Sequence, residues 1–184
     1  METHLQKYKE KKLHKIQYIL FYFFIFAFLG WVLETIYGLF LLGHFTKRGF
    51  LYGPICPIYG YGAVMMITML KKYKNNILKL FSYSFVIFSV FEYIVSFLLD
   101  AMFAMHWWDY TQDFLNLNGR ISIFYSFAWG VIAILFVRYI FPFIEKKIDF
   151  ILDKVPYIVQ NIFVNILPII LLIDTAFSCI RYIK

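Results

Sequence analysis

Charged residues are scarce in this sequence. Asp, Glu, Lys and Arg make up only 16% of the 184 residues, whereas soluble domains carry about 25%. Hydrophobic residues make up 62% and aromatic residues 23%. A soluble domain of this size has too little interior to bury so much apolar surface, and a disordered chain has far less of it. The composition therefore predicts a polytopic membrane protein whose main partner is the lipid bilayer.

Cysteine is rare, and the common catalytic and nucleotide-binding motifs are absent from the sequence. Cys56 and Cys179 form no CxxC pair, so we expect no metal site and no cofactor. Without a GxxxxGK[ST] motif, this chain cannot bind ATP through a P-loop on its own. The sequence also has no GxSxG or HExxH motif, and an enzyme is therefore the less favoured interpretation.

Five apolar runs approach the ~20 residues that a helix needs to cross a bilayer. They predict an all-α protein with about five transmembrane helices in a single integral membrane domain, residues 1–184. The second run contains helix-breaking glycines and prolines between Gly49 and Gly62. We therefore expect residues 44–60 to form a re-entrant or irregular outer loop, followed by a short helix. The five runs are Gln17–Leu42, Leu51–Leu70, Leu80–Leu99, Ile121–Phe141 and Tyr157–Ile180.

The basic residues lie in short clusters between the apolar runs. Eighteen Lys and Arg residues against eleven Asp and Glu residues give a formal net charge of +7. The clusters at 7–15, 71–79 and 138–154 are typical of segments that face anionic lipid at the cytoplasmic surface. They predict a multi-pass protein of the cell membrane with a cytoplasmic N-terminus and an outer C-terminus. Nucleic acid is not an expected partner, because no basic binding module with interleaved aromatic residues is present.

Residues 142–156 have the pattern of an amphipathic helix. Ile144, Ile148, Ile151 and Val155 recur at helical spacing, with acidic and basic residues between them. This pattern favours a helix that lies in the cytoplasmic membrane interface. The alternative is a docking helix for a cytoplasmic partner.

Three acidic residues interrupt the apolar runs: Glu34, Glu92 and Asp174. An acid at the centre of a bilayer costs at least ~2.5–3.5 kcal/mol, and such residues usually serve a function. In the predicted topology all three lie in the outer half of the membrane, below loops that carry further charges. We therefore predict that six charged residues line one outward-facing cavity as ligand-binding or proton-relay candidates. They are Glu34, Arg48, Glu92, Asp109, Arg120 and Asp174.

Small residues share the helix faces of two of these acids. Gly30 and Gly38 lie one turn on either side of Glu34, and Ser89 and Ser96 flank Glu92 at helical spacing. Close helix packing or a polar cavity would need such residues. Both interpretations stay open, because the acids could also pair with arginines only to fix the packing. Aromatic and amide side chains of the outer loops are secondary candidates: Tyr52, Tyr59, Trp107, Trp108, Tyr110 and Asn116.

Two blocks of the sequence resemble a known family. The first contains Gly-Trp before Glu34, Arg-Gly-Phe-Leu-x-Gly-Pro from Arg48 and Pro-Ile-Tyr-Gly from Pro57. The second, residues 92–130, contains Trp-Trp-Asp-Tyr and Asn-Gly-Arg, and Asp174 with Ser178 adds a third match. Together they resemble the CmpB-like, type IV ABC-transporter permeases, integral membrane proteins of Gram-positive bacteria. The resemblance implies a partner ATPase and self-association into a homo-oligomer, and the six charged candidates match its signature positions.

Three functional hypotheses follow. The favoured one is a membrane transport component, either a permease or a substrate-binding subunit, with a charged cavity open to the outside. The first alternative is an envelope enzyme or lipid-handling protein that acts on a lipid-linked or anionic substrate at the outer face. The second alternative is a membrane scaffold whose charges form only structural ion pairs.

Overall fold

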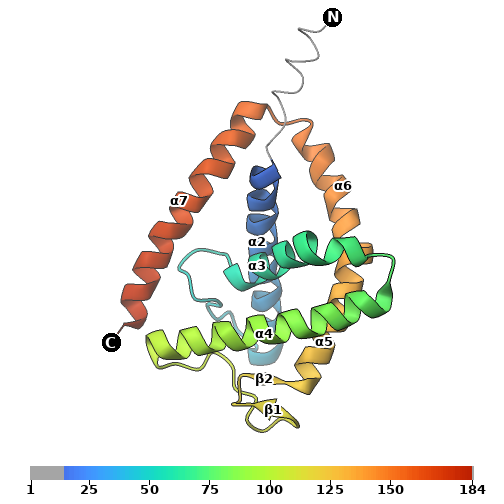
Figure 1. Ribbon diagram of the computed structural model, residues 1–184. Coiled ribbons are helices and arrows are strands. Elements are labelled where there is room, and N and C mark those ends of the chain that lie inside the picture. The colour runs from blue at the N-terminus through green and yellow to red at the C-terminus, as the bar shows by residue number, and fades with distance from the viewer. Residues whose placement is uncertain (1–14, 184) are drawn as a thin grey trace, which may run out of the picture. The chain divides into compact units, whose positions relative to one another are not determined.

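The computed structural model describes residues 15–183, and these are almost entirely helical (Figure 1). This confirms the predicted all-α membrane fold. The long and short α-helices are α2 (Lys15–Leu42), α3 (Pro57–Met65), α4 (Ile77–Phe103), α5 (Ile123–Leu135), α6 (Phe141–Leu152) and α7 (Tyr157–Tyr182). Two π-helical turns, η1 (Met66–Leu70) and η3 (Phe136–Ile140), and a 3-10 turn, η2 (Lys71–Tyr73), extend them. Two short strands, β1 (Asn116–Leu117) and β2 (Ile121–Ser122), complete the described chain.

Four of the described helices are long and apolar enough to cross a membrane. They are Ile16–Leu42, Ile77–Phe103, Ile123–Leu152 and Tyr157–Tyr182. Their outward faces carry large exposed apolar side chains, as lipid-facing helices do. The chain is therefore a multi-pass membrane protein.

The second predicted span is where the structure departs from the expected five. The chain leaves α2 at Gly43, whose φ of +71° suits glycine, and it is irregular until α3 begins at Pro57. The loop predicted over 44–60 is thus present over 43–56, and the short helix that follows it begins earlier than predicted. Residues 57–60 are helical, because proline is well suited to the first turn of a helix. The helical stretch from Pro57 through Tyr73 is roughly 25 Å long at 1.5 Å per residue. This is shorter than the ~30 Å hydrocarbon core of a bilayer.

The predicted amphipathic segment is helical over α6, but it is not a separate element. α6 continues α5 through η3, so that Ile123–Leu152 is one helical run. The expected apolar face is only partly buried, since Ile148 is 6% exposed whereas Ile151 is 55% exposed. Leu152, one helical turn after Ile148, is also buried. The position of α6 relative to a membrane surface remains a prediction.

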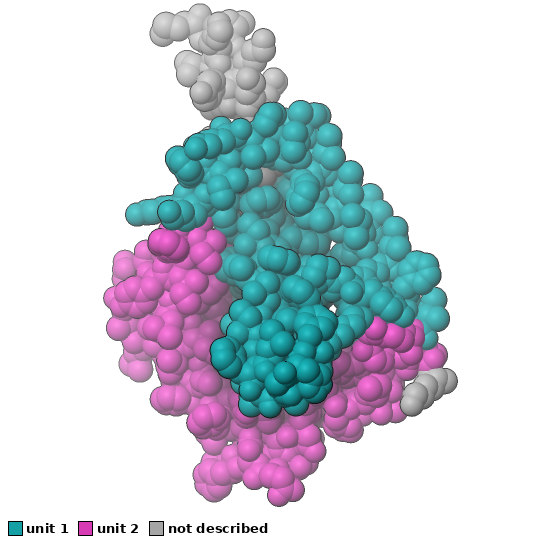
Figure 2. All heavy atoms as spheres, turned by 180° about the vertical axis from the view of Figure 1, so that it is seen from behind, with its two compact units in different colours: residues 1–64, 146–180 teal, residues 65–145, 181–184 magenta. Residues whose placement is uncertain are grey.

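The chain divides into two compact units, which Figure 2 shows in different colours. Unit 1 comprises residues 1–64 and 146–180, and unit 2 comprises residues 65–145 and 181–184. The single integral membrane domain expected from the sequence stays a prediction. The N-terminal lysines that support a cytoplasmic N-terminus, residues 7–12, lie outside the described residues.

Unit 1 is packed through small residues of α2. Ala27 is fully buried, and its carbonyl accepts a hydrogen bond from the Cys56 backbone N–H at 2.9 Å. This bond ties the end of the irregular loop to the middle of α2. At Gly60 of α3, an added Cβ would lie 2.7 Å from the Phe23 ring and backbone. The missing side chain therefore lets α3 approach α2 closely.

Unit 2 is built on the contact between α4 and α5. The Ser84 hydroxyl donates to the Trp129 carbonyl at 2.9 Å, and Ser89 donates to the Ser126 hydroxyl at 2.6 Å. The Phe88 ring, which is fully buried, stacks on the indole of Trp129 with 4.9 Å between centroids. The predicted serine face of the third apolar run is therefore a buried helix–helix contact.

A β-hairpin connects α4 to α5 in unit 2. Its strands pair Asn116 with Ser122 and Leu117 with Ile121. Asn118 and Gly119 have φ values of +54° and +66°, and the Arg120 N–H donates to the Leu117 carbonyl at 3.0 Å. Two consecutive positive φ values with this bond are the features of a type I′ turn, for which Asn-Gly is the preferred pair. The turn fixes the place of Arg120 directly after it.

Candidate functional site

Glu34 of unit 1 lies on a face of α2 that glycines keep open. An added Cβ at Gly30 would lie 2.3 Å from Cγ of Tyr59, so that only glycine leaves room for this ring. One turn further along α2, the Tyr59 hydroxyl donates a hydrogen bond to Oε1 of Glu34. Gly30 and Glu34 thus act together, because the glycine admits the ring whose hydroxyl holds the carboxylate. The small-residue face predicted beside this acid is confirmed.

Arg48 lies over the next turn of the same α2 face. An added Cβ at Gly38 would lie 2.6 Å from Nε and 2.7 Å from Nη2 of Arg48. Nε is buried, and no hydrogen-bond acceptor among the described residues reaches it. No carboxylate of residues 15–183 lies within ion-pair distance of this guanidinium. Arg48 is therefore a partly buried cation without a protein counter-ion in the described part of the chain.

Asp174 joins α7 to the irregular loop of unit 1. Oδ1 accepts the Tyr52 N–H at 2.8 Å and the Ser178 hydroxyl at 3.1 Å. Oδ2 accepts the Gly53 N–H at 2.8 Å. These neutral donors occupy both carboxylate oxygens, which gives Asp174 a structural role in holding the loop. Beside it lies an open, mostly apolar depression of about 470 Å³ that is lined by Tyr52, Ile170, Ile173, Asp174 and Phe177.

Glu92 of unit 2 is a buried carboxyl in the middle of α4. Its exposed fraction is 7%. The Tyr110 hydroxyl donates to Oε1 at 2.9 Å, and the Trp129 indole N–H donates to Oε2 at 3.0 Å. Neither donor carries a charge, and no described cation forms an ion pair with Glu92. The alternative interpretation, in which this acid pairs with an arginine, is therefore not supported among residues 15–183.

Tyr110 comes from the loop that follows α4. Its ring stacks on Tyr125 at 4.2 Å between centroids, and its backbone N–H donates to the Gly119 carbonyl at 2.8 Å. Burial, followed by the negative charge of Glu92, raises the pKa of Tyr110 well above its ordinary value of 10.0. The hydroxyl therefore keeps its proton at any physiological pH and can donate to Glu92.

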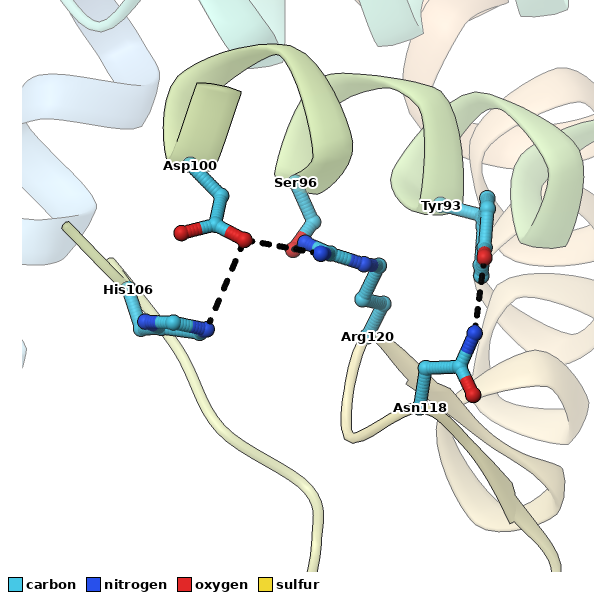
Figure 3. A network of polar contacts seen from close by, with 6 residues as sticks. All are labelled: Tyr93, Ser96, Asp100, His106, Asn118 and Arg120. Carbon is cyan, nitrogen blue, oxygen red and sulfur yellow. Dashed lines mark hydrogen bonds and ion pairs between the residues drawn. The ribbon is translucent and has the colours of Figure 1, made fainter. Parts of the chain in front are cut away.

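Arg120 has a different acidic partner, Asp100, which is not among the six predicted candidates (Figure 3). Nη2 of Arg120 lies 2.8 Å from Oδ2 of Asp100, and Nη1 lies 3.4 Å from the Ser96 hydroxyl. His106 lies 3.8 Å from the same Asp100 oxygen. A signal was available, because Ser89, Glu92, Ser96 and Asp100 continue one helical stripe. The apolar run itself stops at Leu99, one residue before Asp100, so Asp100 lies outside the predicted span.

The remaining candidates of unit 2 shape its loop. Oδ1 of Asp109 accepts the Thr111 N–H at 2.9 Å, which is a local turn. The Asn116 amide donates to the carbonyls of Thr111 and Asp113 and accepts the Gly119 N–H. The Trp108 indole donates to the Arg120 carbonyl at 3.1 Å, while Trp107 packs edge-on against Phe103. These side chains position Tyr110 and Arg120.

The six charged candidates thus fall into two local groups. Glu34, Arg48 and Asp174 belong to unit 1, whereas Glu92, Asp109 and Arg120 belong to unit 2. Their convergence on a single outward-facing cavity stays a prediction. Residues 15–183 contain no group of three His, Cys, Asp or Glu side chains that could hold a metal ion. Both cysteines are free thiols.

Comparison with known proteins identifies the family of the chain. Searches of curated proteins and of solved structures give no significant match. A family model described as "Putative ABC-transporter type IV" matches residues 21–179. That region contains Glu34, Arg48, Glu92, Asp109, Arg120 and Asp174, together with the four apolar helices. Because the match spans most of the sequence, the chain belongs to this family of ABC-transporter-type membrane proteins.

Proposed function

We propose that the chain is the permease subunit of an ABC transporter, which moves a small solute across the bilayer. The observation that carries this proposal is the uncompensated carboxyl of Glu92 inside an apolar helix of a transporter-family protein. Such a group is costly to keep in a membrane, and ionisable residues there usually mark the pathway of a solute or an ion. The sequence has no P-loop motif. In this proposal an ATPase partner supplies ATP hydrolysis.

The lengths of the connections favour a permease over a substrate-binding subunit. Outside the long helices, the candidates lie in two connections, residues 43–56 and 104–122, apart from Tyr59 in the short helix α3. Each is far shorter than the ~40 residues below which a domain rarely folds without extra crosslinks or metals. Neither can form a separate binding domain on the membrane surface. A solute would therefore be bound among the helices themselves.

The contacts also separate candidate solute-binding residues from structural ones. Asp100 and Arg120 form an ion pair, and Asp174 holds the loop of unit 1 through the backbone N–H groups of Tyr52 and Gly53, so these residues serve the packing. Glu92 and Arg48 have no ion-pair partner in the described chain, and the donors to Glu92 are side chains, so that Glu92 holds no loop backbone in place. We therefore assign Glu92 and Arg48 as the residues that contact solute during transport.

An uptake comparison tests the proposed permease. Cells that produce the chain and its ATPase partner are compared with cells that lack the chain, and solutes on both sides of the membrane are profiled. We expect at least one small solute whose distribution depends on the chain and on ATP. Glu92→Gln should abolish that dependence. Glu145→Gln is the matched control, because Glu145 is a partly exposed carboxylate that pairs with Lys71 at 2.9 Å.

One outcome would contradict the permease, and a second would contradict the role of Glu92 in it. An unchanged solute profile together with altered envelope lipids would favour the enzyme or lipid-handling alternative. If Glu92→Gln lowered the stability of the protein and left solute distribution intact, Glu92 would be only a packing residue. In both cases the protein level in the membrane has to match that of the Glu145→Gln control.

The proposed orientation, N-terminus inside and C-terminus outside, depends on the short second helical stretch. An odd number of crossings is needed, so residues 57–73 would have to cross together with the four long helices. We propose that they do, with the irregular loop 43–56 completing the crossing from the outer side. A reporter fused after Lys184 distinguishes the two cases. An enzyme active only outside the cytoplasm should work in this position, and activity of a cytoplasm-only reporter would overturn the orientation.

A further inference from the structure

Glu92 has an unusual set of partners for a membrane-embedded acid. Both oxygens accept hydrogen bonds, Oε1 from Tyr110 and Oε2 from Trp129. Arg120, which contacts the same face of α4, bonds Asp100 and Ser96 instead. The site is therefore satisfied in its hydrogen bonds but not in its charge. A proton is the smallest group that can remove this charge without a cavity.

The two partners differ in what they can do when a proton arrives. A tryptophan indole N–H only donates, so Oε2 must remain an acceptor in every state. A tyrosine hydroxyl both donates and accepts. If Oε1 takes a proton, its new O–H can donate to the Tyr110 oxygen, and the Tyr110 O–H turns away from the carboxyl. Both states therefore keep the Glu92–Tyr110 and Glu92–Trp129 hydrogen bonds without movement of heavy atoms.

We infer that Glu92 is a reversible proton-binding site in which the proton sits on Oε1 and Tyr110 reverses the direction of their hydrogen bond. The proton comes from hydronium in the adjoining water and returns to water on release. No bond between heavy atoms forms or breaks. Trp129 holds the other oxygen in place throughout.

The position of Tyr110 gives the proton a way in. Tyr110 belongs to the connection after α4, outside the long helices, and it is only half-buried. Other titratable or charged groups lie around the pair on each packed element. Asp113 of the same loop and Tyr125 of α5 raise the pKa of Tyr110. Asp100 of α4 and Arg120 of the hairpin form an ion pair with each other, so neither leaves a net charge next to Glu92.

This inference adds a proton site to the proposed permease. It rests on the proposed function in one respect only, namely that binding of the proton is coupled to movement of the solute. The binding of the proton itself is a property of unit 2 alone. It can therefore be tested on the carboxyl, independently of any solute. A failed transport assay and a failed proton assay would then be distinguishable.

Infrared difference spectroscopy of the purified, detergent-solubilised full-length protein tests the site. Spectra recorded at high and low pH, in H₂O and D₂O, report the carbonyl stretch of a protonated carboxyl. We expect a band that grows as the pH is lowered and is lost in Glu92→Gln. Trp129→Phe should shift this band to higher frequency, because the carbonyl oxygen loses its donor. Tyr110→Phe should change the pH at which the band appears, since the carboxyl proton loses its acceptor.

Two kinds of control are available: a variant at Glu34, the other carboxyl that accepts a hydrogen bond from a tyrosine, and variants that keep the Glu92 carboxyl. Tyr59→Phe, which changes the partner of Glu34, should leave the Glu92 band unchanged. Tyr110→Phe and Trp129→Phe keep the carboxyl, so they test the site even if Glu92→Gln does not fold. A Glu92 band that is absent at every pH, or present at every pH, in the folded protein would overturn the inference. Insensitivity of the band to Tyr110→Phe would overturn it as well.

Discussion

Units 1 and 2 each place a glutamate of a long apolar helix against a tyrosine hydroxyl, Glu34 against Tyr59 and Glu92 against Tyr110. The surroundings of the two acids differ. Glu92 is buried and has a second donor in Trp129. Glu34 is only half-buried, and Tyr59 is the one hydrogen-bond donor described for it. The same pair of residue types is therefore a closed site in unit 2 and a more open one in unit 1.

The arginines make the opposite contrast. Arg120 of unit 2 is paired with Asp100, which leaves Glu92 in neutral surroundings. Arg48 of unit 1 lies at Gly38, one turn of α2 from Glu34, and forms no ion pair in the described chain. Unit 1 therefore keeps an acid and a base near each other but unpaired, whereas unit 2 pairs its base elsewhere and isolates its acid. The order of charged residues along the sequence does not reveal this difference.

The largest expected effect tests how tightly each unit is packed around its acid. Gly30→Ala would place Cβ 2.3 Å from Cγ of Tyr59, at the root of a side chain that cannot swing away. Gly130→Ala would meet the outer edge of the Phe81 ring at 2.4 Å, which can shift. We expect losses in the free energy of unfolding of about 3 kcal/mol and about 1 kcal/mol, respectively. Unfolding titrations in mixed micelles measure both.

Tyr59→Ala is the control for this comparison. Without the Tyr59 ring, Gly30→Ala should no longer destabilise the protein, because the clash has been removed and alanine favours a helix. Equal losses for Gly30→Ala and Gly130→Ala would show that unit 1 is not more tightly constrained than unit 2.

The next effect compares the two tyrosine hydroxyls. Tyr110→Phe removes one of the two donors to a buried carboxyl, and Tyr59→Phe removes the donor to a half-buried one. We expect losses in the free energy of unfolding of about 2 kcal/mol and about 1 kcal/mol, because only the half-buried acid can be rehydrated. The same micelle titration measures them at neutral pH. A larger loss for Tyr59→Phe would reverse the assignment of the closed and open sites.

A smaller effect separates the two arginines. Methionine keeps the apolar stem and removes the charge. Arg48→Met should either change the free energy of unfolding by less than about 0.5 kcal/mol or raise it. The reason is that an apolar side chain replaces a partly buried guanidinium that has no counter-ion. Arg120→Met should lower it, but by less than Tyr110→Phe, because Asp100 is 27% exposed and water can replace the lost cation.

Restoring the balance of charge is the check on this prediction. Asp100→Asn should recover part of the loss in an Arg120→Met chain, because no carboxylate is then left without its cation. If Arg48→Met proves as destabilising as Arg120→Met, Arg48 has a counter-ion in the folded protein, and the contrast between the units disappears.

Part of this arrangement could be predicted from the sequence because it depends on local spacing. Gly30, Glu34 and Gly38 are four residues apart, so a helix has to place them on one face. Glycines and prolines interrupt the second apolar run and predict an irregular loop over 44–60, which the structure has over 43–56. The serines beside Glu92 likewise predict a close helix contact, which Ser89 and Ser126 make.

Other features depend on contacts between distant segments, which spacing does not encode. Tyr110 reaches Glu92 only because the loop after α4 folds back, held by the hairpin turn at Asn118 and Gly119. The Asn-Gly pair is a recognised signal for such a turn. Even so, a turn does not say which helix its next residue, Arg120, will meet. To predict the pairing with Asp100, one would have to know that α4 continues to Phe103, beyond the end of the apolar run.

The smallest expected effect uses Cys56 as a reporter for the charge of Glu34. Burial, and then the negative charge of Glu34, raise the pKa of the Cys56 thiol from 9.0 to about 11. The thiol therefore stays protonated up to about pH 11, and the stability that it contributes is complete below pH 9 and lost as the pH rises towards 11.

In a Cys179→Ser background, alkylation by a maleimide should be slow at pH 8. Its rate should keep rising above pH 9 instead of levelling off, because the thiolate is the nucleophile. Glu34→Gln should shift this profile modestly towards lower pH, whereas Glu92→Gln, which has no part in raising this pKa, should leave it in place. An unchanged profile in Glu34→Gln would overturn the contribution of Glu34 to the raised pKa of the Cys56 thiol.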